Sequence, residues 1–263
     1  MSRLQFQFGC GSLKLAGTLD TAPGTTGLLI VSGGNEIRSG AFSGQSLIAA
    51  RIAKAGFPVF RFDRRGIGDS QGENRGFRSS TGDIRSALEA FRAMAPQMER
   101  VIGFGNCDAA SALMLAQGKG FEGLVLSNPW TVETEKENGH EEPQHSAASI
   151  RARYLAKLKD PKEIARLLRG GVNLRKLIGG VKKSMSSAST VSGLATEMRD
   201  GIADYMGAVS ILLASADRTA QMFEENWDVL DPRIARCEGA GHAYVETDHR
   251  VWLEEQVLSA LRA

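Results

Sequence analysis

The chain has 263 residues, of which 42% are hydrophobic and 24% are charged, values typical of a globular protein with one large α/β domain. The formal net charge of only +2 gives no overall electrostatic reason to expect nucleic-acid binding. Three cysteines at no metal-ligand spacing fit a reducing compartment and predict no metal site. The first 19 residues lack the apolar core of a signal peptide, and no apolar run approaches transmembrane length. We therefore expect a cytoplasmic protein with no transmembrane segment.

Strand and helix patterns alternate along most of the chain. Alternating polar and apolar residues predict two antiparallel strands at the start, joined by a turn that contains glycine. Further on, short apolar runs indicate strands buried on both faces of a sheet, and apolar residues at helical spacing indicate helices between them. The predicted strands cover 4–8, 13–19, 27–31, 58–62, 101–104, 123–127, 209–214 and 233–237. The predicted helices cover 43–55, 83–94 and 107–117, then start at about 219 and at 250.

The alternation stops between residues 130 and 201, where polar loop, basic helical patterns and a Ser-rich stretch follow one another. From Arg151 to Lys183 there are eleven Lys or Arg against two acids, with leucines at roughly helical spacing. We expect a mostly parallel sheet with helices on both faces, formed by 1–129 and 202–263, and a helical lid over 130–201. The basic lid surface is either a solvated face or a site for an anionic partner, such as an acyl-carrier protein, an anionic sugar or a membrane surface.

A tight turn at Cys107 is the most informative local pattern. A short apolar strand ends near Gly105, and a helix rich in small residues follows Cys107. Gly105, Cys107 and Ala109 have the small-x-nucleophile-x-small spacing of a nucleophile elbow, in which a strained turn presents one reactive side chain. A helix N-terminus beside a thiol favours the thiolate. The alternative is that Cys107 is a small buried hydrophobic residue.

A nucleophilic cysteine needs a base and a group that orients the base. His242 lies in the loop Gly239-Ala240-Gly241-His242, after the last predicted strand, and is the candidate base. Asp217 follows an earlier strand and is the candidate orienting acid, although it can also cap the next helix. Asp231 is a rival acid that better fits a turn. The other histidines lie in a polar stretch (His140, His145) or open the last helix (His249).

Backbone amides near the nucleophile are the candidates for an oxyanion hole. One amide comes from Asp108, and the second comes from Gly34 or Asn35, in the glycine-containing loop after the strand at 27–31. We further expect Gly33, Trp130 and Tyr244 to contact the substrate.

The order of nucleophile, acid and histidine, with the oxyanion loop upstream, resembles the α/β-hydrolase superfamily. The segment Phe62-Asp63-Arg64-Arg65-Gly66-Ile67-Gly68-Asp69-Ser70-Gln71-Gly72-Glu73 resembles the loop after the fourth strand of that superfamily. More narrowly, four segments resemble exosortase A system-associated hydrolases, which are bacterial proteins linked with exopolysaccharide and protein-sorting loci. These segments are Gly33-Gly34-Asn35, the Asp63 loop, Asn106-Cys107-Asp108-Ala109 and Asp217-Arg218-Thr219-Ala220. The resemblance implies a cytoplasmic hydrolase or acyltransferase that uses no cofactor.

Two features depart from the superfamily pattern. Ser32 stands where lipases often have a histidine, and the nucleophile is cysteine instead of serine. Because an acyl-cysteine is a thioester, it forms readily from other thioesters and can pass its acyl group to water, an alcohol or an amine. We expect a small-molecule or carrier-bound acyl substrate, and a lactone or ester remains open because dienelactone hydrolases also use cysteine. The rival interpretation is a non-catalytic scaffold that binds a partner through the lid.

Overall fold

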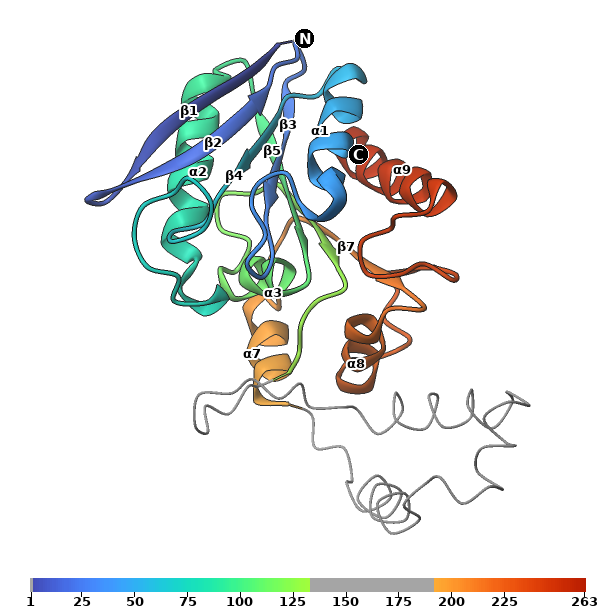
Figure 1. Cartoon of the computed structure of the whole chain (residues 1–263). Helices are drawn as coiled ribbons and strands as arrows, with labels where there is room; N and C mark the ends of the chain where they lie inside the picture. Colours follow the sequence, from blue (N-terminus) through green and yellow to red (C-terminus); the bar gives the residue numbers. More distant parts are fainter. Residues whose placement is uncertain (1, 133–191) are drawn as a thin grey trace, which may run out of the picture.

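The computed structural model describes residues 2–132 and 192–263, in which eight strands form a sheet of order β1-β2-β4-β3-β5-β6-β7-β8 (Figure 1). Strands β1 and β2 pair antiparallel, as do β2 and β4, and every other pair of neighbours is parallel. The strands are β1 (Arg3–Cys10), β2 (Leu13–Asp20), β3 (Thr26–Val31), β4 (Val59–Phe62), β5 (Arg100–Asn106), β6 (Gly123–Ser127), β7 (Ala208–Ala214) and β8 (Ile234–Cys237). The predicted mostly parallel α/β sheet is thus confirmed.

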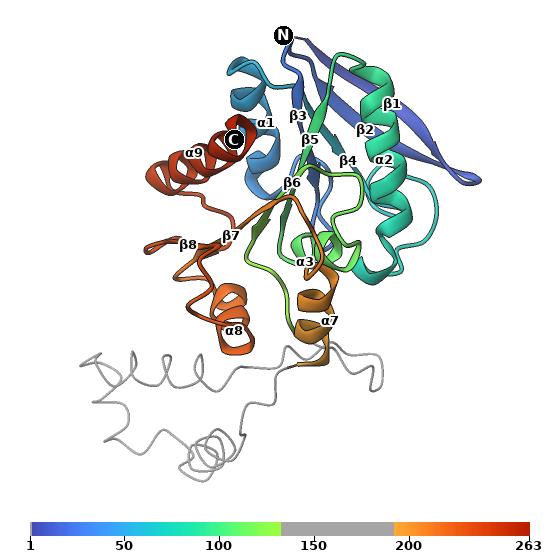
Figure 2. The same ribbon diagram turned by 180° about the vertical axis from the view of Figure 1, so that it is seen from behind.

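Helices cover both faces of this sheet, as the two opposite views show (Figures 1 and 2). They are α1 (Gly44–Lys54), α2 (Thr81–Met94), α3 (Asp108–Leu115), α7 (Gly193–Gly201), α8 (Arg218–Asn226) and α9 (Thr247–Arg262). Buried side chains of α1 and α9 share one hydrophobic cluster, and those of α2, α3, α7 and α8 share another. The sheet therefore lies between two helical layers.

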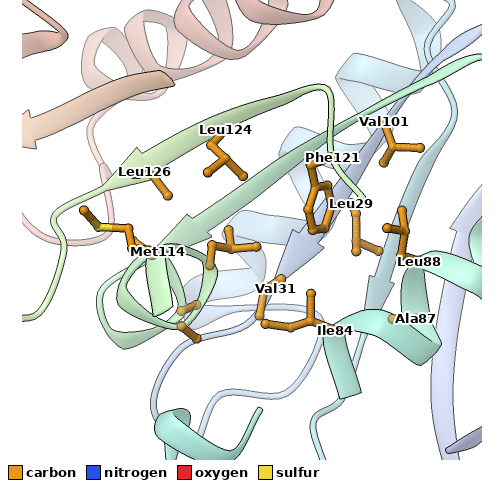
Figure 3. Packing of buried hydrophobic residues seen from close by; sticks show 14 of the residues in the cluster. Leu29, Val31, Ile84, Ala87, Leu88, Val101, Met114, Phe121, Leu124 and Leu126 are labelled. Atoms are coloured by element: carbon orange, nitrogen blue, oxygen red, sulfur yellow. The ribbon is translucent and has the colours of Figure 1, made fainter. Parts of the chain in front are cut away.

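Strand β3 shows how the apolar runs produce this arrangement. Successive side chains of a strand point to opposite faces, so a strand between two helical layers must be apolar at every position. Leu28 and Ile30 join the cluster of α1 and α9, whereas Leu29 and Val31 join the cluster on the other face. Figure 3 shows Leu29 and Val31 packed with Ile84 of α2. All four β3 side chains are fully buried.

Helix α7 lies within the range 130–201 predicted as the lid, but it packs against the sheet domain. Leu194, Ala195 and Met198 are buried in the same cluster as Leu113 and Met114 of α3. Their spacing places them on one face of a helix, which packs against α3. The basic segment 151–183, with His140 and His145, lies outside the described residues.

The parallel strands place the candidate residues at one edge of the sheet. The loops that carry Gly34, Cys107, Asp217 and His242 follow the carboxyl ends of β3, β5, β7 and β8. Because parallel strands all end at the same edge, residues far apart in the sequence meet there. In the two described ranges, no helix combines the length and apolar content that a bilayer crossing requires.

Candidate active site

Cys107 occupies a strained turn between β5 and α3. Its φ of 62° and ψ of −130° are unusual for a residue other than glycine, and such strain costs roughly 1–3 kcal/mol. The backbone holds the turn from both sides, because the Cys107 amide donates to the Ser127 carbonyl at 3.0 Å and the Cys107 carbonyl accepts from Ala110. The helix predicted from Cys107 begins at Asp108, since a residue with this φ cannot be helical. The thiol is partly exposed at the tip of the turn.

Small residues around the turn are required by direct contacts. A Cβ atom at Gly105 would lie 2.7 Å from the backbone of Ala109, and one at Gly33 would lie 2.6 Å from the Asn106 carbonyl oxygen. Side-chain carbon atoms do not approach backbone this closely. Gly33 also lies beside Cys107, since the same Cβ would be 3.5 Å from the Cys107 Cβ. The glycine spacing seen in the sequence therefore has a steric cause.

Asp217 and His242 are brought together at the same edge of the sheet. The Asp217 Oδ2 lies 2.8 Å from the His242 Nδ1, and the Asp217 side chain is buried. The same Oδ2 accepts from the amide of Ala220 at 3.3 Å and so caps α8. The two roles considered for Asp217 are therefore both filled by one carboxylate. Its position is held by the helix cap, which leaves the carboxylate directed at the imidazole.

His242 carries a strongly raised pKa, of about 10. The hydrogen bond to Asp217 is the largest cause, a hydrogen bond with Cys107 is the second, and burial acts in the opposite direction. A carboxylate beside the ring favours its charged form, so the contact with Asp217 makes His242 a stronger proton acceptor. His242 is thus hydrogen-bonded to Asp217 and lies close to Cys107.

Two asparagines that the sequence did not single out position the histidine loop. Asn106 donates through its side-chain amide to the His242 carbonyl at 3.2 Å, and Asn128 donates to the Asn106 side chain at 3.0 Å. Asn128 is buried and also accepts from the Ala214 amide at 2.8 Å. These bonds link the ends of β5, β6 and β7 to the histidine loop. The sequence signal that could have identified these two residues is a polar side chain at the carboxyl end of each of two neighbouring apolar strands.

The predicted oxyanion loop lies beside the nucleophile, but its Gly34 amide is already occupied. The Gly34 N–H donates to the Asp108 Oδ1 at 2.6 Å. Arg64, which is buried, donates to the Gly34 carbonyl at 2.5 Å and lies 3.4 Å from the Asp108 Oδ2. The carboxylate of Asp108 therefore stands where a substrate oxyanion would use the Gly34 amide. Sequence reasoning placed the backbone of Asp108 here and missed its side chain and Arg64.

The other predicted contacts are distributed around this edge. Asn35 is exposed, and its side chain accepts from Asn74 at 2.8 Å. Trp130 packs beside the cluster of α3, and its backbone amide donates to the Ser111 hydroxyl at 2.9 Å. Tyr244 is buried, with its hydroxyl 3.1 Å from that of Ser127. Its burial raises its pKa strongly, so it stays a neutral phenol.

The alternative residues have structural partners of their own. Asp231 pairs with Arg233 at 2.6 Å, which lowers the pKa of Asp231 to about 2, and this carboxylate is part of the turn before β8. His249 lies 3.1 Å from the Glu246 carboxylate at the start of α9. Cys10 and Cys237 are buried strand residues. Across the described stretches, no three His, Cys, Asp or Glu side chains gather as metal ligands would.

Comparisons with known proteins agree with this fold. A family model described as serine aminopeptidase, S33, matches residues 26–184. The α/β hydrolase GrgF from Penicillium sp. sh18 is 17% identical, with a TM-score of 0.64 over 100% of this chain and 98% of its own. The esterase PF2001 from Pyrococcus furiosus is 15% identical, with a TM-score of 0.62 over 99% of this chain and 91% of its own.

A third solved structure is XC6422 from Xanthomonas campestris, described as a member of the α/β serine hydrolases without a lid. It is 12% identical, with a TM-score of 0.59 over 100% of this chain and 94% of its own. No protein of curated function matches the chain. At these identities the likeness to the solved structures is one of fold.

Proposed function

Since this chain belongs to the hydrolase family described as serine aminopeptidase, S33, and has the α/β-hydrolase fold, we propose that it acts on esters or thioesters through Cys107. The observation that carries this proposal is the hydrogen bond between Asp217 and His242 close to Cys107, which stands at a strained turn. Such strain is maintained where a side chain must be presented for chemistry. Cysteine is the nucleophile, His242 the acid and base, and Asp217 the orienting group.

The acylation step begins from a thiolate–imidazolium pair. The Cys107 sulfur attacks the substrate carbonyl carbon, and the carbonyl electron pair moves to oxygen. When the tetrahedral intermediate collapses, the bond to the leaving alkoxide or thiolate breaks, and the His242 imidazolium gives that group its proton. The products are an acyl-cysteine, a neutral imidazole and the free alcohol or thiol.

The deacylation step regenerates the pair. Neutral His242 takes a proton from water or from an acceptor alcohol, and the oxygen attacks the thioester carbonyl. The carbon–sulfur bond then breaks, which leaves the acid or ester product, a thiolate and an imidazolium. Whether water or another acceptor enters decides between hydrolysis and acyl transfer. The hydrogen bond from Asp217 holds the imidazole in the tautomer that this step needs.

Oxyanion stabilisation requires a rearrangement of Asp108. The amides of Asp108 and Gly34 are the proposed donors, but Gly34 donates to the Asp108 side chain in the resting structure. A substrate oxyanion replaces that carboxylate, which keeps Arg64 as its counter-ion. Asn35 is the alternative second donor, because its amide lies in the same loop.

The proposed substrates are thioesters and activated esters, including acyl groups held on a carrier. The basic segment 151–183 would attract an acidic carrier protein or another anionic partner, and the resemblance to exosortase-associated hydrolases suggests exopolysaccharide metabolism. A non-catalytic scaffold is the second candidate. The observation in its favour is the Gly34 amide occupied by Asp108.

Alkylation of Cys107 distinguishes these two functions. We expect iodoacetamide to label Cys107 rapidly at neutral pH, because the charged His242 stabilises the thiolate, and labelling to slow by an order of magnitude or more in His242→Ala. Cys10 and Cys237 are buried and serve as internal controls in the same mass spectrum. A 4-nitrophenyl ester should leave a matching acyl mass on Cys107. Equally slow labelling of the wild type and of His242→Ala, with no acyl adduct, would show that the chain is a non-catalytic scaffold.

A further inference from the structure

A pocket lies immediately beside the proposed nucleophile and histidine. It has a volume of about 80 Å³ and opens between the segment 36–48 and the segment 243–253. Ile48, Phe104 and Leu253 contribute apolar walls, and Tyr244 adds its buried ring. Asn106, which precedes Cys107, and Ala243, which follows His242, also line it. The pocket therefore adjoins the turn that carries Cys107 and the loop that carries His242.

The mouth of the pocket exposes apolar side chains. Phe42 is 80% exposed and has a φ of 51°, a conformation that costs an aromatic residue energy. Val245 is also largely exposed on the opposite side of the opening. An aromatic side chain held in this way at a pocket entrance indicates a surface that a ligand covers.

Arg250 contributes a positive charge to the lining of this pocket. Its Nε is buried and has no hydrogen-bond partner, and it forms no ion pair with any described residue. The neighbouring acids on α9 are engaged elsewhere: Glu246 with His249 at 3.1 Å, and Glu254 with Arg51 at 2.9 Å. Arg250 as a whole is only partly buried, and it lines the pocket without an ion pair to a described residue. A carboxylate of a ligand can therefore pair with its guanidinium.

Glu36 is the other charged residue that lines the pocket. Its carboxylate accepts from the Ala41 amide at 3.3 Å and forms no ion pair with Arg250. The charge of Glu36 therefore opposes an anionic ligand, whereas the charge of Arg250 attracts one. The preference of the pocket for anionic over neutral ligands therefore depends on both Glu36 and Arg250, and it can be measured in variants of each residue.

We propose that this pocket binds the distal carboxylate of a short acyl chain, with Arg250 as its partner, so that the preferred substrates are half-esters or half-thioesters of small dicarboxylic acids. The part of this inference that concerns the reacting carbonyl rests on the proposed function. Binding of the carboxylate by Arg250 does not depend on it. A planar guanidinium matches a carboxylate through two parallel hydrogen bonds. The volume is well below the roughly 300–1,000 Å³ of pockets for drug-sized ligands, which limits the chain to a few carbons.

Binding and turnover are measured separately to test this proposal. Calorimetry compares glutarate with butyrate on the wild-type protein, and hydrolysis compares the mono-4-nitrophenyl ester of glutaric acid with 4-nitrophenyl butyrate. We expect Arg250→Gln to weaken glutarate binding and to lower kcat/KM for the glutarate ester about 10- to 100-fold, the range of one charge-assisted contact, with butyrate unaffected. Arg250→Lys should retain part of the preference, and Glu36→Gln should increase it.

A matched control is Arg262→Gln, which removes an exposed arginine in the last turn of α9 and should change nothing. Equal affinity for glutarate and butyrate, or glutarate binding that is indifferent to Arg250, would overturn the proposal. Arg250-dependent binding of inorganic phosphate without glutarate binding would also overturn it. If glutarate binding depends on Arg250 but no ester acylates Cys107, the carboxylate site stands and the proposed catalytic function fails.

Discussion

The candidate active site has a proposed acid–base side and a proposed oxyanion side, which differ in whether their groups are already placed for a substrate. On one side, the Asp217 Oδ2 lies 2.8 Å from the His242 Nδ1, and the ring is close to Cys107. On the other side, the Gly34 amide is engaged by the Asp108 carboxylate, and Arg64 holds both. On the acid–base side, Asp217 and His242 already lie together without substrate. On the oxyanion side, the Asp108 side chain occupies the Gly34 amide. In the proposed mechanism, a substrate must therefore displace the Asp108 carboxylate from the Gly34 amide.

This difference has a simple electrostatic reason. An unoccupied anion site with an amide and a buried guanidinium is unfavourable, because both groups lose water without gaining a partner. The carboxylate of Asp108 fills that need in the absence of substrate. The acid–base side has no such need, since Asp217 and the charged His242 satisfy one another. Substitutions at Cys107, Asp217, Asp108 and Gly105, each with companion variants, test the comparison from the largest expected effect to the smallest.

Removal of the nucleophile should have the largest effect. We expect Cys107→Ala to lower kcat by roughly 10⁴- to 10⁶-fold, as loss of a nucleophile does in related catalytic constellations. Cys107→Ser should retain weak activity that increases with pH above neutrality, because a hydroxyl needs a neutral imidazole and Asp217 still raises the pKa of His242 in this variant. Initial rates between pH 6 and 10 provide the measurement. Full activity in the alanine variant would exclude the acyl-cysteine.

Loss of the orienting carboxylate should rank second. We expect Asp217→Asn to lower kcat about 10⁴-fold, since the amide favours the wrong imidazole tautomer. Asparagine can still cap α8, so a loss of stability much smaller than that of Asp217→Ala would show that the cap, and not the imidazole, is the main role of Asp217 in the fold.

The same substitution has a predicted pH signature. The folded pKa of His242 is raised to about 10, against about 6.5 in an unfolded chain, so its charge stabilises the fold fully below pH 6.5. That contribution is lost as the pH increases from about 6.5 through 10. The difference in melting temperature between the wild type and Asp217→Asn should therefore shrink over this range. A constant difference would contradict the ion pair.

Opening of the oxyanion side should have a smaller effect of opposite sign. We expect Asp108→Ala to raise kcat/KM by up to about tenfold, because the substrate no longer competes with a charge-assisted hydrogen bond at the Gly34 amide. The backbone amide of residue 108 remains in place. Arg64→Gln is the companion variant, and it should lower activity because it releases the Gly34 carbonyl. A decrease of activity in Asp108→Ala would mean that the carboxylate itself takes part in catalysis.

The smallest effect concerns the scaffold of the turn. Gly105→Ala would bring a methyl group to 2.7 Å from the Ala109 backbone, and we expect a loss of stability of ~1–3 kcal/mol from overpacking. Gly9→Ala is the matched control, because a Cβ there has no neighbour within 4 Å. Thermal unfolding of both variants measures the difference. Equal melting temperatures would show that the turn can relax without cost.

Local patterns in the sequence predicted much of the fold. Strands such as β3 and β6 were evident as continuous apolar runs, because burial on both faces leaves no position for a polar residue. The glycine and alanine spacing around Cys107 predicted the turn, since steric demands within a few residues depend only on neighbours in the chain. The start of α3 was misplaced by one residue for the same local reason: the strained φ of Cys107.

Contacts between distant residues could not be predicted in this way. Asn106 and Asn128 support the His242 loop across more than a hundred residues of sequence, and their types alone carry no sign of that partner. Similarly, α7 lies within the range 130–201 that was predicted as the lid, yet its apolar face packs against α3. Side-chain direction and the distance between elements decide such contacts, and neither follows from a local pattern.

By itself, the sequence determined the alternation of strands and helices, the order of nucleophile, acid and histidine, and the chemistry that a cysteine permits. Those properties depend on side-chain size, polarity and covalent structure. Only the tertiary structure decided that Asp108 occupies the Gly34 amide, that Arg64 contacts both, and that Arg250 lines a pocket without an ion pair to a described residue. Each of these depends on which charges meet when loops from different strands converge at one edge, because electrostatic interactions are set by distance and burial.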